Sequence, residues 1–70
     1  MSEPRRANVL GLGLIGGSIA RALTDRGWRV SGDDHNPDRV RTAQTMGLIA
    51  AEGLWPNAEV TFVATPVLTV

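Results

Sequence analysis

Residues 8–18 read Asn8-Val9-Leu10-Gly11-Leu12-Gly13-Leu14-Ile15-Gly16-Gly17-Ser18. An apolar run leads into glycines spaced as G-x-G-x-x-G, and a helix-like pattern follows them. Each glycine then has a physical role, since Gly11 permits a tight turn, Gly13 lets a pyrophosphate approach the backbone, and Gly16 lets the helix pack close to the sheet. The helix start supplies unpaired N–H groups and partial positive charge for a phosphate. The spacing therefore indicates a dinucleotide-binding loop.

The sequence around this loop predicts strands that alternate with helices. Residues 7–12 form a short apolar run, which is typical of a strand buried on both faces of a parallel sheet. A helix is expected from Leu14 to Arg26, and Gly27 is placed to end it in the left-handed conformation. A second strand is expected over residues 28–34. The predicted apolar stripe of the helix consists of Ile15, Ile19, Ala22 and Leu23.

A second helix and a third strand follow. Asn36-Pro37 is typical of a helix start, because an N-cap side chain precedes a proline at the first helical position. The expected narrow apolar stripe of that helix consists of Val40, Ala43 and Met46, and Gly47 is the expected C-cap. A very short strand is expected at residues 48–50. Residues 60–64 are β-branched and apolar and predict the last strand.

This order predicts an α/β fold: a partial, truncated, doubly wound parallel sheet of the Rossmann type, β-α-β-α-β. Residues 1–7 are expected to be a flexible leader, and residues 8–70 the N-terminal part of a dinucleotide-binding domain. Such a sheet binds its ligands beyond the carboxyl ends of its strands. Loops 11–16, 33–36 and 64–67 would meet there.

Length and composition exclude several classes of protein. Seventy residues with no cysteine provide neither a disulfide nor a thiolate metal site. Seven basic and seven acidic side chains cancel, which argues against a nucleic-acid partner or an anionic membrane surface. The longest uncharged stretch, residues 7–20, is too short to span a bilayer. A cytoplasmic protein is expected.

The acidic residue that a dinucleotide site requires has two candidates. Asp33 and Asp34 both lie about 20 residues beyond the glycines, where a carboxylate would accept hydrogen bonds from the adenosine ribose. Successive strand residues point to opposite faces, so only one of the two is expected to address the ribose. A carboxylate there favours NAD over NADP, although His35, Arg39 and Arg41 lie nearby. His35 is expected to line the adenine side, and no catalytic residue or metal ligand is predicted.

The string from Val9 to Ser18 closely resembles the opening of prephenate and arogenate dehydrogenases, the oxidoreductases of tyrosine biosynthesis. Residues 30–37 and 58–67 resemble the same family at the end of its second strand and in its Ala-Thr-Pro-Val loop. By this resemblance, the family's pyrophosphate loop corresponds to Gly11, Gly13, Leu14, Ile15 and Gly16. Its ribose-binding acid corresponds to Asp34. Its loop beside the cofactor corresponds to Ala64, Thr65, Pro66 and Val67. Two residues depart from the family, since Asp33 replaces an uncharged residue and His35 stands where arginine is common.

The resemblance implies an NAD-dependent dehydrogenase that converts prephenate to 4-hydroxyphenylpyruvate with loss of carbon dioxide, or acts on arogenate. It also implies a homodimer. The family's catalytic histidine and substrate-binding arginine have no counterpart here, so the isolated chain is expected to be inactive. Three alternatives stay open: a freestanding nucleotide-binding or regulatory module, a degenerate gene product, and a piece of another NAD(P)-dependent reductase.

Overall fold

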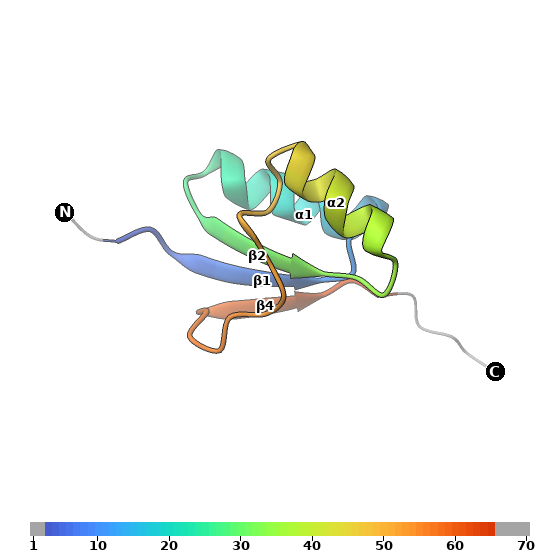
Figure 1. Cartoon of the computed structure of the whole chain (residues 1–70). Helices are drawn as coiled ribbons and strands as arrows, with labels where there is room; N and C mark the ends of the chain where they lie inside the picture. Colours follow the sequence, from blue (N-terminus) through green and yellow to red (C-terminus); the bar gives the residue numbers. More distant parts are fainter. Residues whose placement is uncertain (1–2, 66–70) are drawn as a thin grey trace.

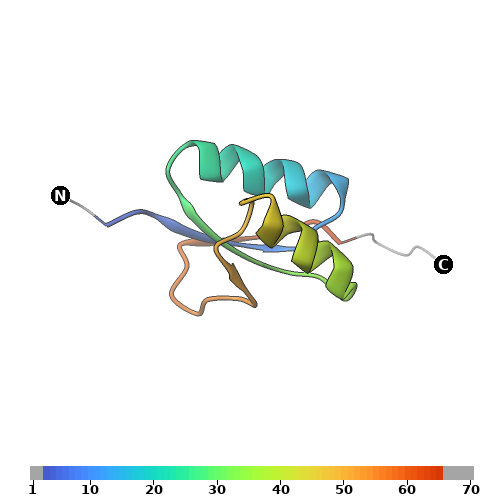
Figure 2. The same ribbon diagram turned by 45° about the horizontal axis from the view of Figure 1, so that its top comes forward.

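The molecule is a parallel sheet with two helices on one face (Figure 1). The computed structural model describes residues 3–65. Its elements are β1 (Arg6–Leu10), α1 (Leu14–Asp25), β2 (Arg29–Asp33), α2 (Pro37–Thr45), β3 (Ala51–Glu52) and β4 (Val60–Val63). The strands are ordered β3-β2-β1-β4, which places β1 in the middle and β4 at an edge. Figure 2 shows both helices on the same side of the sheet. The predicted α/β fold with a Rossmann-like parallel sheet is confirmed.

Several boundaries differ from those predicted by one or two residues, and two of the differences matter most. Just before strand β1 the Arg29 N–H donates to the Arg5 carbonyl over 2.7 Å. The strand begins at Arg6, so residues 6 and 7 of the expected leader belong to the sheet. They do so because β1 has a partner strand on each side. The short strand expected at residues 48–50 is β3, at Ala51–Glu52. It starts later because Ile49 is buried in the core and only the following residues align with β2.

The two faces of the sheet differ in chemistry. Val9 and Val30 belong to the core cluster, to which Phe62 on β4 is joined. On neighbouring positions Asn8 is aligned with Ser31 and with Thr61, which makes a polar row across three strands. Asn8 is 3% exposed and Val9 0% exposed. Burial of β1 on both faces is therefore confirmed, although one of its faces is polar.

Helix α1 packs on the sheet through small residues. Gly16 and Ala20 are its buried residues, and Ile19 and Leu23 pack against the core. The predicted stripe is wrong at two positions, because Ile15 is 70% exposed and Ala22 is also exposed. Gly16 lies against the Gly11 carbonyl in the loop after β1, and Ala20 is buried in the core, so the helix lies close to both. That close approach turns Ile15 outward.

Helix α2 has the termini that its sequence predicts. The Asn36 side chain accepts a hydrogen bond from the Asp38 N–H over 3.0 Å, and Pro37 is the first helical residue. Val40 and Ala43 are buried, as predicted, whereas the prediction is wrong for Met46, which is the C-cap and is 58% exposed. After the helices, Gly27 has φ +85° and Gly47 φ +73°, as expected of left-handed C-terminal glycines.

Candidate dinucleotide site

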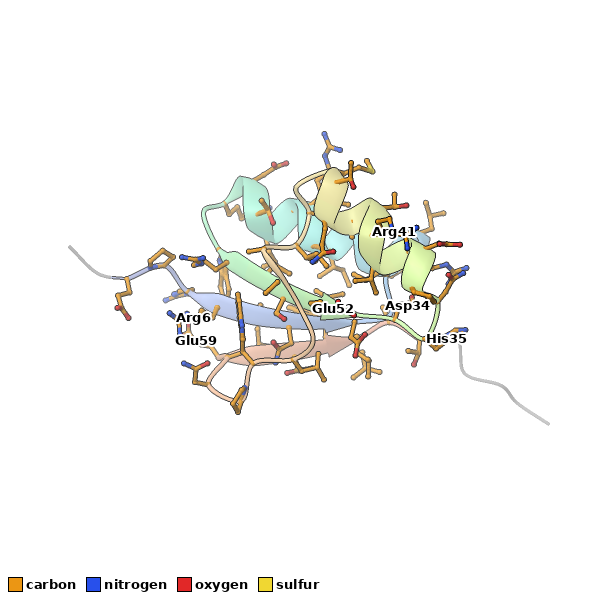
Figure 3. All side chains as sticks on the ribbon, in the orientation of Figure 1. Arg6, Asp34, His35, Arg41, Glu52 and Glu59 are labelled. Carbon is orange, nitrogen blue, oxygen red and sulfur yellow. The ribbon has the colours of Figure 1, made fainter. Side chains whose placement is uncertain are left out.

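Three loops meet at the carboxyl end of the sheet. The Gly11 N–H donates to the Asp33 carbonyl over 2.8 Å, and the Ala64 N–H donates to the Leu10 carbonyl over 2.7 Å. Figure 3 shows Asp34 and His35 at this end and Arg6 and Glu59 at the other. A cavity of about 630 Å³ opens between the loops, lined by Gly11, Gly13, Leu14, Ile15, Ile19, Asp34, His35, Arg39, Val63, Ala64 and Thr65.

Gly11 and Gly16 are required by contacts within the chain. Gly11 has φ +97°, and a Cβ on it would lie 2.8 Å from the Ala64 carbonyl carbon. A Cβ on Gly16 would lie 1.6 Å from the Gly11 carbonyl oxygen. Gly16 thus lets α1 close onto the glycine-rich loop itself, whereas the sequence predicted close packing on the sheet. The loop is therefore closely packed against the backbone of Ala64 and Thr65, just after β4.

Gly13 is different, because nothing within the chain demands a glycine there. A Cβ on Gly13 would make only an ordinary contact, 3.5 Å from Nη1 of Arg39. Gly13 is the N-cap of α1, and no side chain caps the helix or places an acid in its first turn. The neighbouring Leu14 and Ile15 side chains are 89% and 70% exposed. The first turn therefore presents backbone donors and positive potential to the cavity.

Asp34 joins the second strand to the glycine-rich loop. Its Oδ2 accepts from the Leu12 N–H over 2.7 Å, and its Oδ1 accepts from the Asn36 N–H over 2.9 Å. Burial raises the pKa of this carboxyl. The two N–H groups, with Arg39 and His35, outweigh that effect and hold the pKa below its ordinary value. Asp34 is consequently ionised at neutral pH.

The geometry separates the two acidic candidates. Asp34 lines the cavity, whereas Asp33 does not. The Asp33 carboxylate instead accepts from the Asp34 N–H over 2.9 Å and so stabilises the turn after β2. The two residues do point differently, as the alternation of a strand predicts. Of the two acidic residues, Asp34 is therefore the one at the cavity.

The imidazole of His35 and the guanidinium of Arg39 lie beside the Asp34 carboxylate. Nδ1 of His35 lies 3.5 Å from Oδ1, and Nη1 of Arg39 lies 3.8 Å from Oδ2. Arg39 was not among the predicted binding residues, yet it lines the cavity beside Gly13. Its placement follows from the predicted helix start at Pro37, which puts residue 39 in the first turn at this end of the sheet.

Comparison with known proteins identifies similar structures. No family model and no curated protein matches the chain. The crystal structure of arogenate dehydrogenase from Synechocystis matches with a TM-score of 0.80 and 31% identity, over 87% of this chain and 23% of that one. The chain resembles the prephenate and arogenate dehydrogenases. Prephenate dehydrogenase from A. aeolicus, in complex with hydroxyphenyl propionate and NAD+, has the same fold, with a TM-score of 0.78 and 22% identity over 93% of this chain and 26% of that one.

The resemblance predicted from the sequence is thereby confirmed, and the chain spans about a quarter of the length of these dehydrogenases. Of the residues assigned to a dehydrogenase cofactor loop, Ala64 and Thr65 line the cavity, while Pro66 and Val67 lie outside the described residues. Within residues 3–65 no group of three acidic or histidine side chains is placed to hold a metal. No helix in that range is long and apolar enough to cross a membrane.

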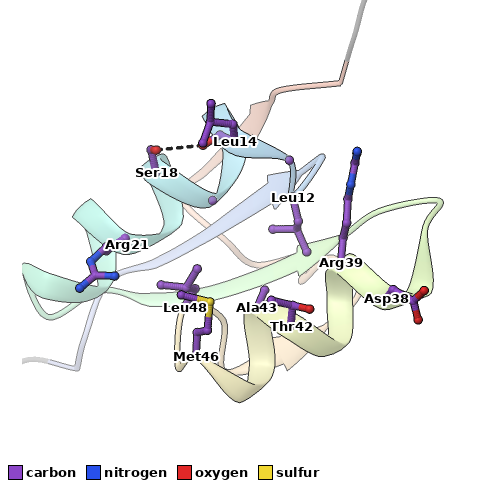
Figure 4. Close-up of a pocket in the computed structure, with 12 residues that line it drawn as sticks. Leu12, Leu14, Ser18, Arg21, Asp38, Arg39, Thr42, Ala43, Met46 and Leu48 are labelled. Carbon is purple, nitrogen blue, oxygen red and sulfur yellow. Dashed lines mark hydrogen bonds between the residues drawn. The ribbon is translucent and has the colours of Figure 1, made fainter.

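A second hollow, of about 460 Å³, lies between α1 and α2 (Figure 4). It shares Gly13, Leu14 and Arg39 with the dinucleotide cavity and is otherwise lined mainly by apolar side chains such as Met46 and Leu48. In its wall the Ser18 hydroxyl donates to the Leu14 carbonyl over 2.8 Å, which satisfies that hydroxyl within α1. Of the predicted cofactor-binding residues, only Gly13 and Leu14 line this groove, and both also line the first cavity.

Proposed function

We propose that the chain is the NAD-binding portion of a prephenate or arogenate dehydrogenase. One observation carries the proposal: the uncapped first turn of α1, the ionised carboxylate of Asp34 and the end of β4 line one cavity. These are the groups that a dinucleotide needs for its pyrophosphate and its ribose. The arogenate dehydrogenase likeness supports the proposal because its sequence identity, 31%, goes beyond a shared fold.

The pyrophosphate would lie against the backbone from Gly13 to Ile15. The N–H groups of a first helical turn have no partner within the helix, and they attract an anion together with the helix dipole. The absence of a side chain at Gly13 leaves this backbone open to close approach. The exposed Leu14 and Ile15 side chains would cover the nucleotide's flank, which reduces their contact with water.

The adenosine ribose would bind at Asp34. Each carboxylate oxygen of Asp34 accepts one backbone N–H and has a further lone pair for a ribose hydroxyl. The side chain is 2% exposed beneath His35 and Arg39, whose own side chains are 83% and 47% exposed. Both long side chains can rotate aside at little cost, which opens the carboxylate to the hydroxyls.

The reaction belongs to the whole protein. NAD, when bound, accepts a hydride, and in the proposed reaction prephenate loses carbon dioxide to give 4-hydroxyphenylpyruvate. This chain holds and orients the nucleotide, and we assign no catalytic residue to it. The isolated chain should therefore bind NAD without turning over substrate. The proposal leaves arogenate as the alternative substrate. It also includes a homodimeric assembly and a cytoplasmic location.

Calorimetric titration of the purified chain with NAD tests the proposal. A Gly13→Val variant should stay folded, because a Cβ there meets only the flexible end of Arg39, although valine is a poorer N-cap than glycine. It should block the pyrophosphate: overpacking costs about 1–3 kcal/mol, so NAD affinity should fall by about 5- to 150-fold. Gly17→Ala is the matched control, since a Cβ at Gly17 meets nothing within 4 Å.

Two results would contradict the proposal. One is a folded chain that gives no heat with millimolar NAD. The other is equal NAD affinity in the wild type and the Gly13→Val variant. Formation of NADH by the 70-residue chain with prephenate, followed by absorbance, would overturn the expected inactivity alone.

A further inference from the structure

The hollow between α1 and α2, hereafter the interhelical groove, runs along both helices. On the side of α1 its lining includes Gly13, Gly17 and Arg21, which are spaced four residues apart and so form one stripe. The facing wall on α2 has the same spacing, with Asp38, Thr42 and Met46. Eight residues of helix rise about 12 Å. Figure 4 shows Arg21 at one end and Asp38 at the other. The groove is therefore elongated and suits an extended chain.

Most of the surface inside the interhelical groove is aliphatic. Leu12 and Ala43 line it and are buried in the core, while Met46 is 58% exposed and Leu14 is 89% exposed. Gly17 leaves open space in the wall, because a Cβ there would meet nothing within 4 Å. An aliphatic chain lying in the groove would remove apolar surface from water on both partners, and such burial is favourable in proportion to its area.

Arg21 gives one end of the groove a positive charge. Asp25 follows one turn later on α1, at a spacing that commonly forms an ion pair. Nevertheless, within residues 3–65 no acidic side chain lies within 4 Å of the Arg21 guanidinium. At the other end Asp38 and Arg39 both line the groove, and their charges cancel. A ligand with one anionic group is therefore favoured, with that group at Arg21.

We propose that the interhelical groove binds an aliphatic monocarboxylate, with the carboxylate at Arg21 and the chain passing Gly17 toward Leu12. A guanidinium can donate two parallel hydrogen bonds to a carboxylate, and such charge-assisted bonds are strong. The chain would cover the exposed side of Met46. This site goes beyond the proposed function, because neither Arg21 nor Gly17 lines the dinucleotide cavity.

Titration of the isotope-labelled 70-residue chain with octanoate, followed by the backbone amide signals in NMR spectra, tests the site. The signals of Gly17, Ser18 and Thr42, which line the groove, should shift. Octanoate should bind about fivefold more tightly than 1-octanol, which is the upper range for an ion pair at the surface. Hexanoate should bind about fourfold more weakly than octanoate, because it lacks two half-buried methylene groups.

Three variants locate the ligand. Arg21→Gln should weaken octanoate about fivefold and remove its advantage over 1-octanol. Arg41→Gln is the matched control: Arg41 is exposed, carries the same charge and does not line the groove, so octanoate affinity should be unchanged. Gly17→Leu places a side chain in the open space of the groove and should weaken both ligands about tenfold. The same open space means that this variant should stay folded.

Several results would overturn the proposal. Equal affinities of the wild type for octanoate and 1-octanol would show that no cation selects the ligand. A loss in Arg41→Gln as large as in Arg21→Gln would show that only net charge matters. Undiminished octanoate binding in folded Gly17→Leu, or shifts confined to residues of the dinucleotide cavity, would place the ligand elsewhere. A folded chain whose amide signals do not move with millimolar octanoate has no such site.

Discussion

Gly16 and Gly17 are neighbours in the first turn of α1, yet only Gly17 has room for a side chain. A Cβ on Gly16 would lie 1.6 Å from the Gly11 carbonyl oxygen, whereas a Cβ on Gly17 would meet nothing within 4 Å. The glycine spacing predicts that the third glycine matters. It does not reveal that the contact is with the first glycine, because that contact depends on how the turn closes.

We expect Gly16→Ala to destabilise the chain. Relief of the contact requires a shift of the loop or of α1, and overpacking of this kind costs about 1–3 kcal/mol, occasionally more. Gly17→Ala should raise stability by about 0.5–1 kcal/mol, because alanine is the better helix former. Urea unfolding of both variants measures the difference. Equal effects of the two substitutions would show that α1 does not approach Gly11 as described.

Asp34 should make the stability of the chain depend on pH. Its pKa in the folded state lies below its ordinary value, so its stabilising contribution is complete above the unfolded pKa of about 3.9. That contribution is lost as the pH falls through the lower folded-state pKa. Urea unfolding between pH 6 and pH 3 should show a loss of stability that is smaller in an Asp34→Asn variant.

An exposed carboxylate provides the comparison for this measurement. Asp25 is exposed at the end of α1. Asp25→Asn should leave the acid-induced loss of stability close to that of the wild type. Equal losses of stability in Asp34→Asn and the wild type between pH 6 and pH 3 would contradict this account. They would show that the ionised Asp34 carboxylate does not stabilise the fold through the Leu12 and Asn36 N–H groups.

At the scale of elements, one side chain of β1 fastens the loop between β3 and β4. The Asn8 amide accepts from the Trp55 N–H over 2.8 Å and donates to the Trp55 carbonyl over 2.9 Å and to Oγ1 of Thr61 over 3.1 Å. Asn8 is buried, and it joins residues 47 positions apart in the sequence. The loop is thereby held against the face of the sheet that the helices leave uncovered.

We expect Asn8→Ala to cost about 1–3 kcal/mol, because it leaves the Trp55 N–H without a partner and removes one of two donors from the Trp55 carbonyl, which also accepts from the Ala58 N–H. Hydrogen exchange of the Trp55 amide should accelerate together with the loss of stability. Thr61→Val removes only the bond to Thr61 and should cost about 0.5–1.5 kcal/mol without affecting that amide. Unchanged protection of the Trp55 amide in Asn8→Ala would contradict the described contact.

The elements themselves were largely predictable from local chemistry. Asn36 and Pro37 start α2, and Gly27 and Gly47 follow the two helices, because caps and left-handed glycines are local requirements. The buried side of α1 was not predictable in full. Its apolar residues outnumber the positions that face the sheet, so which of them are buried depends on the tight approach at Gly16.

For the whole molecule, the sequence predicted the alternation of elements but not which strands would be neighbours. The order β3-β2-β1-β4 places the first strand in the centre, and that order depends on contacts between distant segments. The candidate site was predicted at the carboxyl end for a general reason, namely that parallel strands all end on the same side. Arg39 was not predicted to line the cavity, because its position beside Asp34 depends on a tertiary contact and not on a motif.

The contact of Gly11 with the Ala64 backbone has a consequence for the time order of synthesis. The glycine-rich motif leaves the ribosome well before the segment that backs it. A nascent chain that stops short of residue 64 therefore carries the motif without the cavity. Because contacts between distant residues close slowly, the cavity should form only after the motif itself has been waiting for its partner strand.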